Sequence, residues 1–270
     1  MNRKPLTYRS LRMTRTVFTQ TLREQRRGLI GWSIAFALVP MLYLPSYRTL
    51  RDQGSLNVKQ NKLYDALGLS DFASGAGYLG STIYAMFGLV MMLIFAVTFA
   101  ARSATQEENG SLDLLLAQPI SRVNLLAQRF GALAAQVGVV TAVLTLGVLI
   151  GANSGGLGVA AGNIVAASIG LGLFALTTGT ITLLAGAMTG SRSSTLGIGA
   201  VVGLGSYLAN NLGGTIDGAR WLRRLSPVYY ANGNTPLVNG WSAHVLVLLG
   251  LTALAVSVAI AAFDRRDIAV

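Results

Sequence analysis

Six long runs of mainly apolar residues dominate this sequence, and short polar segments separate them. The runs cover residues 28–46, 78–101, 123–150, 161–189, 195–212 and 241–262. A helix needs about 20 predominantly apolar residues to cross the hydrocarbon core of a bilayer. The pattern therefore predicts an all-α integral membrane protein, with six transmembrane helices making one domain over residues 28–262.

The composition supports a membrane protein and excludes several other classes. Only 11% of the 270 residues are charged, whereas soluble domains average about 25%. The chain has no Cys, so it forms no disulfide framework and no Cys-based metal site. Its net charge of +11 could suggest a nucleic-acid partner. Because the basic residues lie between apolar runs, we expect a lipid bilayer as partner and no nucleic acid.

Residues 1–27 form a basic segment ahead of the first apolar run. The segment lacks the apolar core and small-residue cleavage site of a secretory signal. Leu11, Phe18 and Leu22 recur at spacings of seven and four residues, which is typical of a helix. We expect an amphipathic elbow helix lying on the anionic cytoplasmic leaflet. The alternative is a disordered basic tail that only sets the topology.

The distribution of Lys and Arg predicts the orientation of the chain. Six spans place both termini on one side, together with 14 of the 21 Lys and Arg residues. By the positive-inside rule, the N-terminus and the 263–270 tail are then cytoplasmic. The Arg cluster at 220–224 counts against this arrangement. If the Gly-rich fifth run, 195–212, were re-entrant, the 220–224 loop would be cytoplasmic and the last span would end outside.

The most polar stretch between two spans is residues 106–122. It begins with the acidic pair Glu107 and Glu108, passes through Gly110 and ends at Arg122. Leu112, Leu115 and Leu116 would form one apolar side of a helix, and Pro119 would end that helix. Proline lacks the backbone N–H and disfavours helix for the residue before it. This pattern predicts a short amphipathic surface helix, and the alternative is a solvated loop.

The run EENGSLDLLLAQPISR, residues 107–122, resembles the cytoplasmic motif of ABC-2 type permeases. These are the membrane subunits of ABC exporters, whose ATPase is often a separate chain. The resemblance implies that residues 106–122 form the coupling helix that docks on an ATP-binding subunit. Leu112, Leu115 and Leu116 would then form the docking face, and Gly110 and Pro119 would set the helix ends. Glu107, Glu108 and Arg122 would make polar contacts.

The same resemblance implies partners and a pathway. Two copies of an ABC ATP-binding subunit would pair with this chain and a second permease chain, identical or related, in the cell membrane. ATP and Mg would bind to the partner subunit, with no cofactor bound directly here. The family suggests that the second and fifth helices line the pathway, where our candidates are Met91, Met92, Phe95 and Asn210. The alternatives are ordinary packing for the first three and a helix-end cap for Asn210.

Motifs for other chemistry are missing from the sequence. No G-x-x-x-x-G-K-[ST] occurs, so the chain carries no recognisable P-loop. The middles of the spans hold essentially no ionisable residues, which argues against ion coupling. His244 is the only histidine and lies near a span end. Together with these absences, the resemblance to ABC-2 type permeases implies a non-enzymatic permease subunit of an ATP-driven exporter. The alternatives are a stand-alone secondary transporter, or a non-transporting scaffold or regulator with an ABC ATPase partner.

Overall fold

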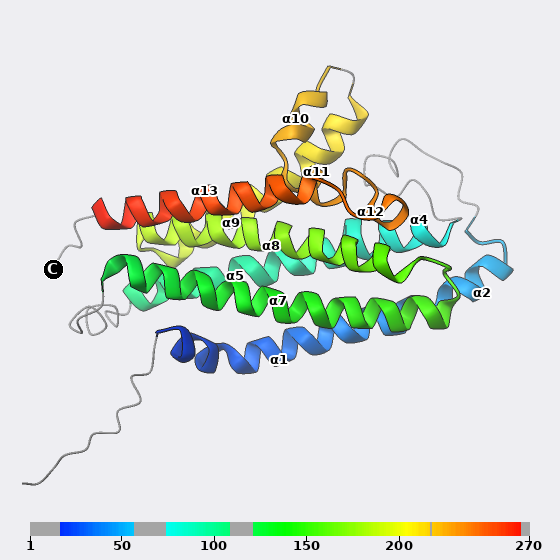
Figure 1. Cartoon of the computed structure of the whole chain (residues 1–270), viewed down its shortest axis with the longest axis horizontal. Helices are drawn as coiled ribbons and strands as arrows, with labels where there is room; N and C mark the ends of the chain where they lie inside the picture. Colours follow the sequence, from blue (N-terminus) through cyan, green and yellow to red (C-terminus); the bar gives the residue numbers. More distant parts are fainter. Residues whose placement is uncertain (1–16, 57–73, 109–120, 217, 266–270) are drawn as a thin grey trace, which may run out of the picture.

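A computed structural model describes residues 17–56, 74–108, 121–216 and 218–265. These residues form helices and connecting turns, without strands. In chain order the elements are α1 (Val17–Tyr43), α2 (Ser46–Asp52), α4 (Gly75–Leu79), the π-helix η1 (Gly80–Phe87), α5 (Gly88–Glu108), α7 (Arg122–Gly155), α8 (Ala161–Thr189), α9 (Arg192–Thr215), α10 (Arg220–Leu225), α11 (Pro227–Asn232), α12 (Pro236–Asn239) and α13 (His244–Arg265). The long helices lie side by side along one axis (Figure 1).

The predicted all-α membrane fold is confirmed. Within the described residues, five helical segments are long and apolar enough to cross a membrane: Val17–Asp52, Gly75–Arg102, Val123–Gly155, Ala161–Thr189 and His244–Ala262. The predicted fifth run corresponds to α9, which is helical but is not among these five. The count of six spans therefore stays a prediction.

The first span and the predicted elbow belong to one helix in the part that the structure describes. Helix α1 runs from Val17 to Tyr43 without a break at residue 27. Residues 1–16 of the predicted elbow lie outside the described residues. A separate elbow helix on the membrane surface therefore also stays a prediction.

Helix α8 is the centre of the bundle. It packs against α5, α7, α9, α11 and α13, and most of its side chains are buried. Its buried hydroxyls donate to carbonyl groups four residues earlier, as Thr178 does to Phe174 at 2.9 Å. The Thr177 hydroxyl also lies 2.8 Å from the Thr252 hydroxyl on α13. Because an unpaired polar group is costly away from water, these bonds let a Thr-rich helix sit in an apolar bundle.

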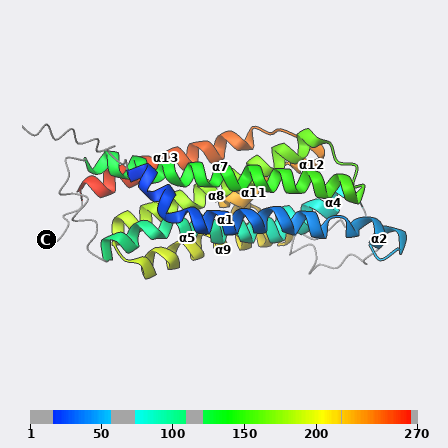
Figure 2. The same cartoon turned by 90° about the horizontal axis from the view of Figure 1, so that it is seen from below.

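Helix α1 lies along α7 over most of its length (Figure 2). The approach is close because three glycines on α7, at four-residue spacing, face the α1 backbone. A Cβ on Gly147 would lie 2.9 Å from the Ala37 carbonyl oxygen, and one on Gly151 would lie 2.5 Å from that of Pro40. Gly155 faces Leu44 in the same way. Small residues at this spacing are the usual means of close helix approach in membranes.

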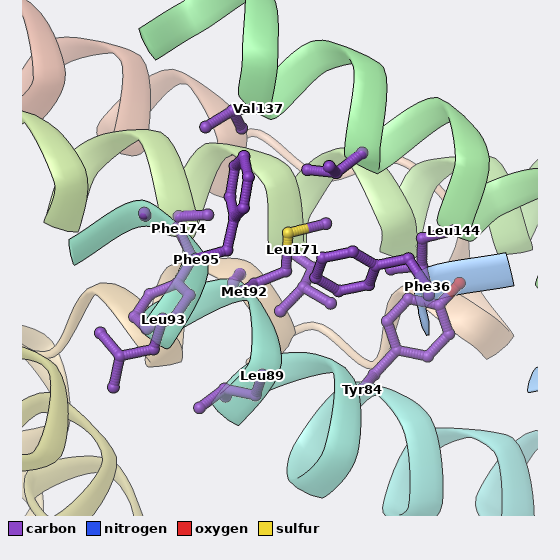
Figure 3. Close-up of a cluster of buried hydrophobic side chains, with 14 of the residues drawn as sticks. Phe36, Tyr84, Leu89, Met92, Leu93, Phe95, Val137, Leu144, Leu171 and Phe174 are labelled. Carbon is purple, nitrogen blue, oxygen red and sulfur yellow. The ribbon is translucent and has the colours of Figure 1, made fainter. Parts of the chain in front are cut away.

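Large apolar side chains fill the space between α1, α5, α7 and α8. Phe36, Met92, Phe95 and Phe174 are each at most 1% exposed, and Figure 3 shows them in one cluster. The ring centroids of Phe36 and Phe95 lie 6.3 Å apart in an edge-on arrangement. Burying such a ring away from water stabilises a fold by about 1.5–3 kcal/mol. Where the ring would otherwise contact lipid, the stabilisation comes from dense packing instead.

Between α4 and α5, the second span is a π-helix instead of an α-helix. Its last turn closes with a bond from the Gly88 N–H to the Ile83 carbonyl, five residues back. A Cβ on Gly88 would lie 2.5 Å from that same oxygen, so glycine makes the wide turn possible. Such segments are rare and frequently occur at functional sites.

Candidate functional site

The helix ends that flank the predicted coupling stretch meet at one end of the bundle. The start of α1, the end of α5, the start of α7, the α8–α9 turn and the end of α13 all lie there (Figure 1). The opposite end carries α2, α4 and α12. Residues 106–122 thus connect two core helices on the same side as the described ends of the chain.

Most of the predicted coupling residues fall outside the described residues. These are Gly110, Leu112, Leu115, Leu116 and Pro119. The backbone at Glu107 and Glu108 forms the last turn of α5, and Arg122 begins α7, but their side chains are not among those described. The coupling helix, its docking face and its polar contacts therefore stay predictions.

The residue before Arg122 has a clear structural role. The Ser121 side chain accepts a hydrogen bond from the Asn124 N–H at 3.2 Å and so caps the N-terminus of α7. A serine cap satisfies one of the four N–H groups that a helix start leaves unpaired. The cap fixes the residue at which the connecting stretch ends and α7 begins.

Polar contacts tie the first turns of α7 to α1. The Phe18 N–H donates to Gln128 Oε1 at 3.1 Å, and Gln136 Nε2 donates to Gln25 Oε1 at 3.0 Å. Gln25 and Gln136 are 6% and 1% exposed. A buried amide bonded across two helices fixes their relative position, because breaking the bond leaves both amides unsatisfied. The start of α7 and the start of α1 are thus held together as one unit.

Gln25, Gln128 and Gln136 are not among the functional residues predicted from the sequence. The available signal was a neutral polar residue, Gln136, inside an otherwise apolar third run. Arg129, the residue after Gln128, is also buried at 8% exposure. A buried polar side chain inside a membrane segment normally has a partner in the protein, and this rule would have found the α1–α7 contact.

The predicted pathway residues lie in two places. Met92 and Phe95 are fully buried in the bundle of this one chain, and Met91 is half-buried next to them. Asn210, near the end of α9, is half-buried and donates to Asn211 Oδ1 at 3.2 Å. In this conformation Met92 and Phe95 therefore contact their own chain, and the role of all four as pathway residues stays a prediction.

The side of α5 turned away from the core carries its own apolar stripe. Phe87 of η1 and Val90 and Ile94 of α5 are 39%, 43% and 46% exposed. Helix α9, which packs beside α5, exposes Val201 and Leu204. In a bilayer these side chains contact lipid or another membrane protein. The structure thus leaves an apolar face on α5 and α9 that the chain's own core does not use.

His244 and its surroundings form an aromatic cluster. The imidazole ring centroid lies 5.5 Å from that of Tyr229 and 5.7 Å from that of Tyr230. The Arg223 guanidinium lies 5.1 Å from the centre of the Tyr229 ring. Among the described residues, no group of three or more His, Cys, Asp or Glu side chains could hold a metal ion. The cluster therefore consists of aromatic and cation–π contacts that pack α10, α11 and α13 together.

Comparison with known proteins agrees with this architecture. None of the curated proteins with which the chain was compared matches it. A family model described as "Multidrug efflux system permease Rv1217c, C-terminal domain" matches residues 15–264. The match covers every described helix apart from the last residue of α13, and it is consistent with the ABC-2 type resemblance of residues 107–122. The chain is a member of this family of membrane permeases.

Proposed function

We propose that this protein is the membrane subunit of an ATP-driven exporter, coupled to a separate ATP-binding subunit through residues 106–122. The observation that carries the proposal is the family match over residues 15–264. The name of that family suggests efflux of several drug-like compounds as the activity. ATP hydrolysis is assigned to the partner because this sequence contains no P-loop motif.

The position of the coupling stretch supports a mechanical role. It connects α5, which packs against α8 and α9, with α7, which packs against α1 and α8. Helix α7 also packs against α13. A force applied to the stretch therefore reaches every long helix of the bundle, either directly or through one neighbouring helix. The Gln25–Gln136 bond makes α1 follow α7. Closure of two ATP-binding subunits would in this way rock the whole bundle between inward- and outward-open states.

The apolar stripe of α5 and α9 supports a pathway between two permease chains. A second chain, identical or related, would face Phe87, Val90 and Ile94 across the route of the cargo. These residues carry no charge, which suits hydrophobic or amphipathic compounds. Both termini would lie in the cytoplasm, next to the ATP-binding subunits, and the complex would sit in the cell membrane.

The proposal is tested by purifying the tagged chain gently from its native membrane and identifying what accompanies it. A stoichiometric ATP-binding subunit is expected with the unmodified chain. Changing Leu115 and Leu116 together to Asp should remove it, because the substitution places two charges on the docking face. Ser193→Asp is the matched control, since Ser193 is exposed in the α8–α9 region at the same end of the bundle. This control should keep the partner.

Transport measurements separate the proposal from its alternatives. Proteoliposomes that contain the complex should move a fluorescent drug only with ATP, and collapse of the proton gradient should not stop them. Transport by the chain alone, driven by an ion gradient, would replace the proposal with a secondary transporter. Stable association with an ATP-binding subunit, without any ATP-driven movement of cargo, would favour the scaffold.

A further inference from the structure

We propose that a cavity at the end of the bundle away from the coupling stretch binds a small, uncharged, amphipathic compound. The cavity has a volume of about 270 Å³. It lies between α4 and η1 on one side and α11, α12 and α8 on the other. It belongs to a single chain and is separate from the apolar stripe of α5 and α9.

The lining of the cavity defines the chemistry of its ligand. The polar lining residues besides Tyr84 are Ser74, Ser81, Asn232 and Thr235. Glycine, alanine, proline, leucine and valine complete the wall, and among the described residues that line it no side chain is charged. A charged ligand would lose its hydration there without gaining a counter-ion. A neutral molecule with an apolar body and a hydrogen-bonding group fits such a wall.

The cavity exists because of small residues and the π-helix. Gly77, Gly80 and Ala85 leave space on the side of the second span that faces α12. The wide π turns direct the Tyr84 carbonyl outward, where it accepts a bond from Asn232 Nδ2 at 3.1 Å. This bond joins η1 to α11 across the cavity wall. Asn232, a lining residue at the end of α11, is thus held by the π-helical backbone of the second span.

The inner wall is held rigid by the Tyr84 side chain. Its hydroxyl lies 2.7 Å from the Ser168 hydroxyl and donates to the Ile164 carbonyl at 3.3 Å, both on α8. Both contacts are buried. The outer wall is open, since Val238 is 66% exposed and Ser74 is also exposed. A rigid floor and an accessible mouth are the features of a preformed small-molecule site.

This inference goes beyond the proposed function and does not depend on ATP coupling. Binding to the cavity requires only the folded chain. The experiment below uses the chain without any ATP-binding subunit, so its failure would leave the coupling proposal untouched. Loss of the coupling proposal would equally leave the cavity site in place.

The absence of cysteine from the sequence allows a direct test. Ala85→Cys places one thiol on the cavity wall, and Ser55→Cys places one on an exposed turn after α2. Each variant is purified in a mild detergent and its alkylation by N-ethylmaleimide is timed with and without N-phenyl-1-naphthylamine, a neutral amphipathic probe. Ser81→Cys, a nearly isosteric change on the same wall, provides a second position if Ala85→Cys folds poorly.

The expected result is protection confined to the cavity. At a probe concentration about nine times Kd, about one tenth of the chains are empty, so alkylation of the cavity thiol should slow about tenfold. The Ser55→Cys thiol should react at an unchanged rate. The cation trimethylphenylammonium should protect neither position. A cavity thiol that the probe does not protect, or that does not react at all, would overturn the proposal, as would equal protection of Ser55→Cys or equal protection by the cation.

Discussion

The contact between α1 and α7 makes a sharp prediction about Gly151. Its backbone faces the α1 backbone so closely that a Cβ would lie 2.5 Å from the Pro40 carbonyl oxygen and 3.1 Å from the Leu44 Cδ1 atom. The first of these neighbours is backbone and cannot move by a rotamer change. Gly151→Ala should therefore force α1 and α7 apart.

The size of the effect follows from overpacking. Extra methyl groups in a well-packed core typically cost about 1–3 kcal/mol. Gly138 lies on the same helix, is exposed, and has no atom within 4 Å of the position of a Cβ. Gly138→Ala should therefore show only the gain in helix propensity, about 1 kcal/mol. The two variants make the same chemical change on one helix and differ only in what the new methyl group meets.

The assay is thermal unfolding of both purified variants in the same detergent, followed by tryptophan fluorescence. A free-energy change of about 1 kcal/mol shifts Tm by about 2–4 °C in chains of this size class. Gly151→Ala should therefore melt about 2–12 °C below Gly138→Ala. Equal Tm values for the two variants would refute the argument. They would show that α1 and α7 do not approach so closely, or that they can move apart without a loss of stability.

Two further perturbations test the buried polar contacts. Gln25→Leu or Gln136→Leu alone leaves the other amide without its partner and should lower the free energy of unfolding by about 1–3 kcal/mol. The double variant should lose less than the sum of the two single variants, measured as changes in Tm. Additive losses would contradict the hydrogen bond. Asn232→Leu removes the side-chain donor to the Tyr84 carbonyl, so backbone amides of residues 80–88 should exchange hydrogen faster. Asn239→Leu, which removes an exposed amide that donates to Asn234 and Thr235 just before α12, is the control and should leave that exchange unchanged.

The class of fold could be predicted from the sequence because the bilayer imposes a simple rule. Long uncharged runs must form helices, and five of the predicted runs correspond to helices of spanning length and apolarity. The helix ends were less predictable. Helix α1 includes Val17 and continues through residue 27, the expected boundary between the elbow segment and the first span. Nothing in the Arg-rich sequence stops a helix at that boundary.

The interior contacts could not be predicted, for physical reasons. Apolar periodicity identifies a helix but does not say which side contacts protein and which contacts lipid, since both sides are apolar. In the second span Met92 and Phe95 are buried within this chain, while Phe87 and Val90 face outward, and the apolar pattern of the sequence does not distinguish these positions. The π-helix was equally hidden, because a single glycine such as Gly88 does not identify a wide turn, and the Asn232 amide that bonds to the Tyr84 carbonyl lies far away in sequence.

Helix α9 shows why average apolarity underestimates a packed membrane helix. Its buried side is built from glycine: a Cβ on Gly199 would lie 2.6 Å from Thr182 Oγ1, and Gly203 is covered by Leu93 of α5. Gly199, Gly203 and Ser206 lower the mean hydropathy of α9, yet these three residues are buried in the bundle. Its outward side is apolar, with Val201 at 71% and Leu204 at 56% exposure. At 24 residues and about 1.5 Å per residue, α9 is long enough to cross a bilayer. This length is compatible with the prediction of six spans, in which the 220–224 cluster would lie at the outer surface and the C-terminus in the cytoplasm.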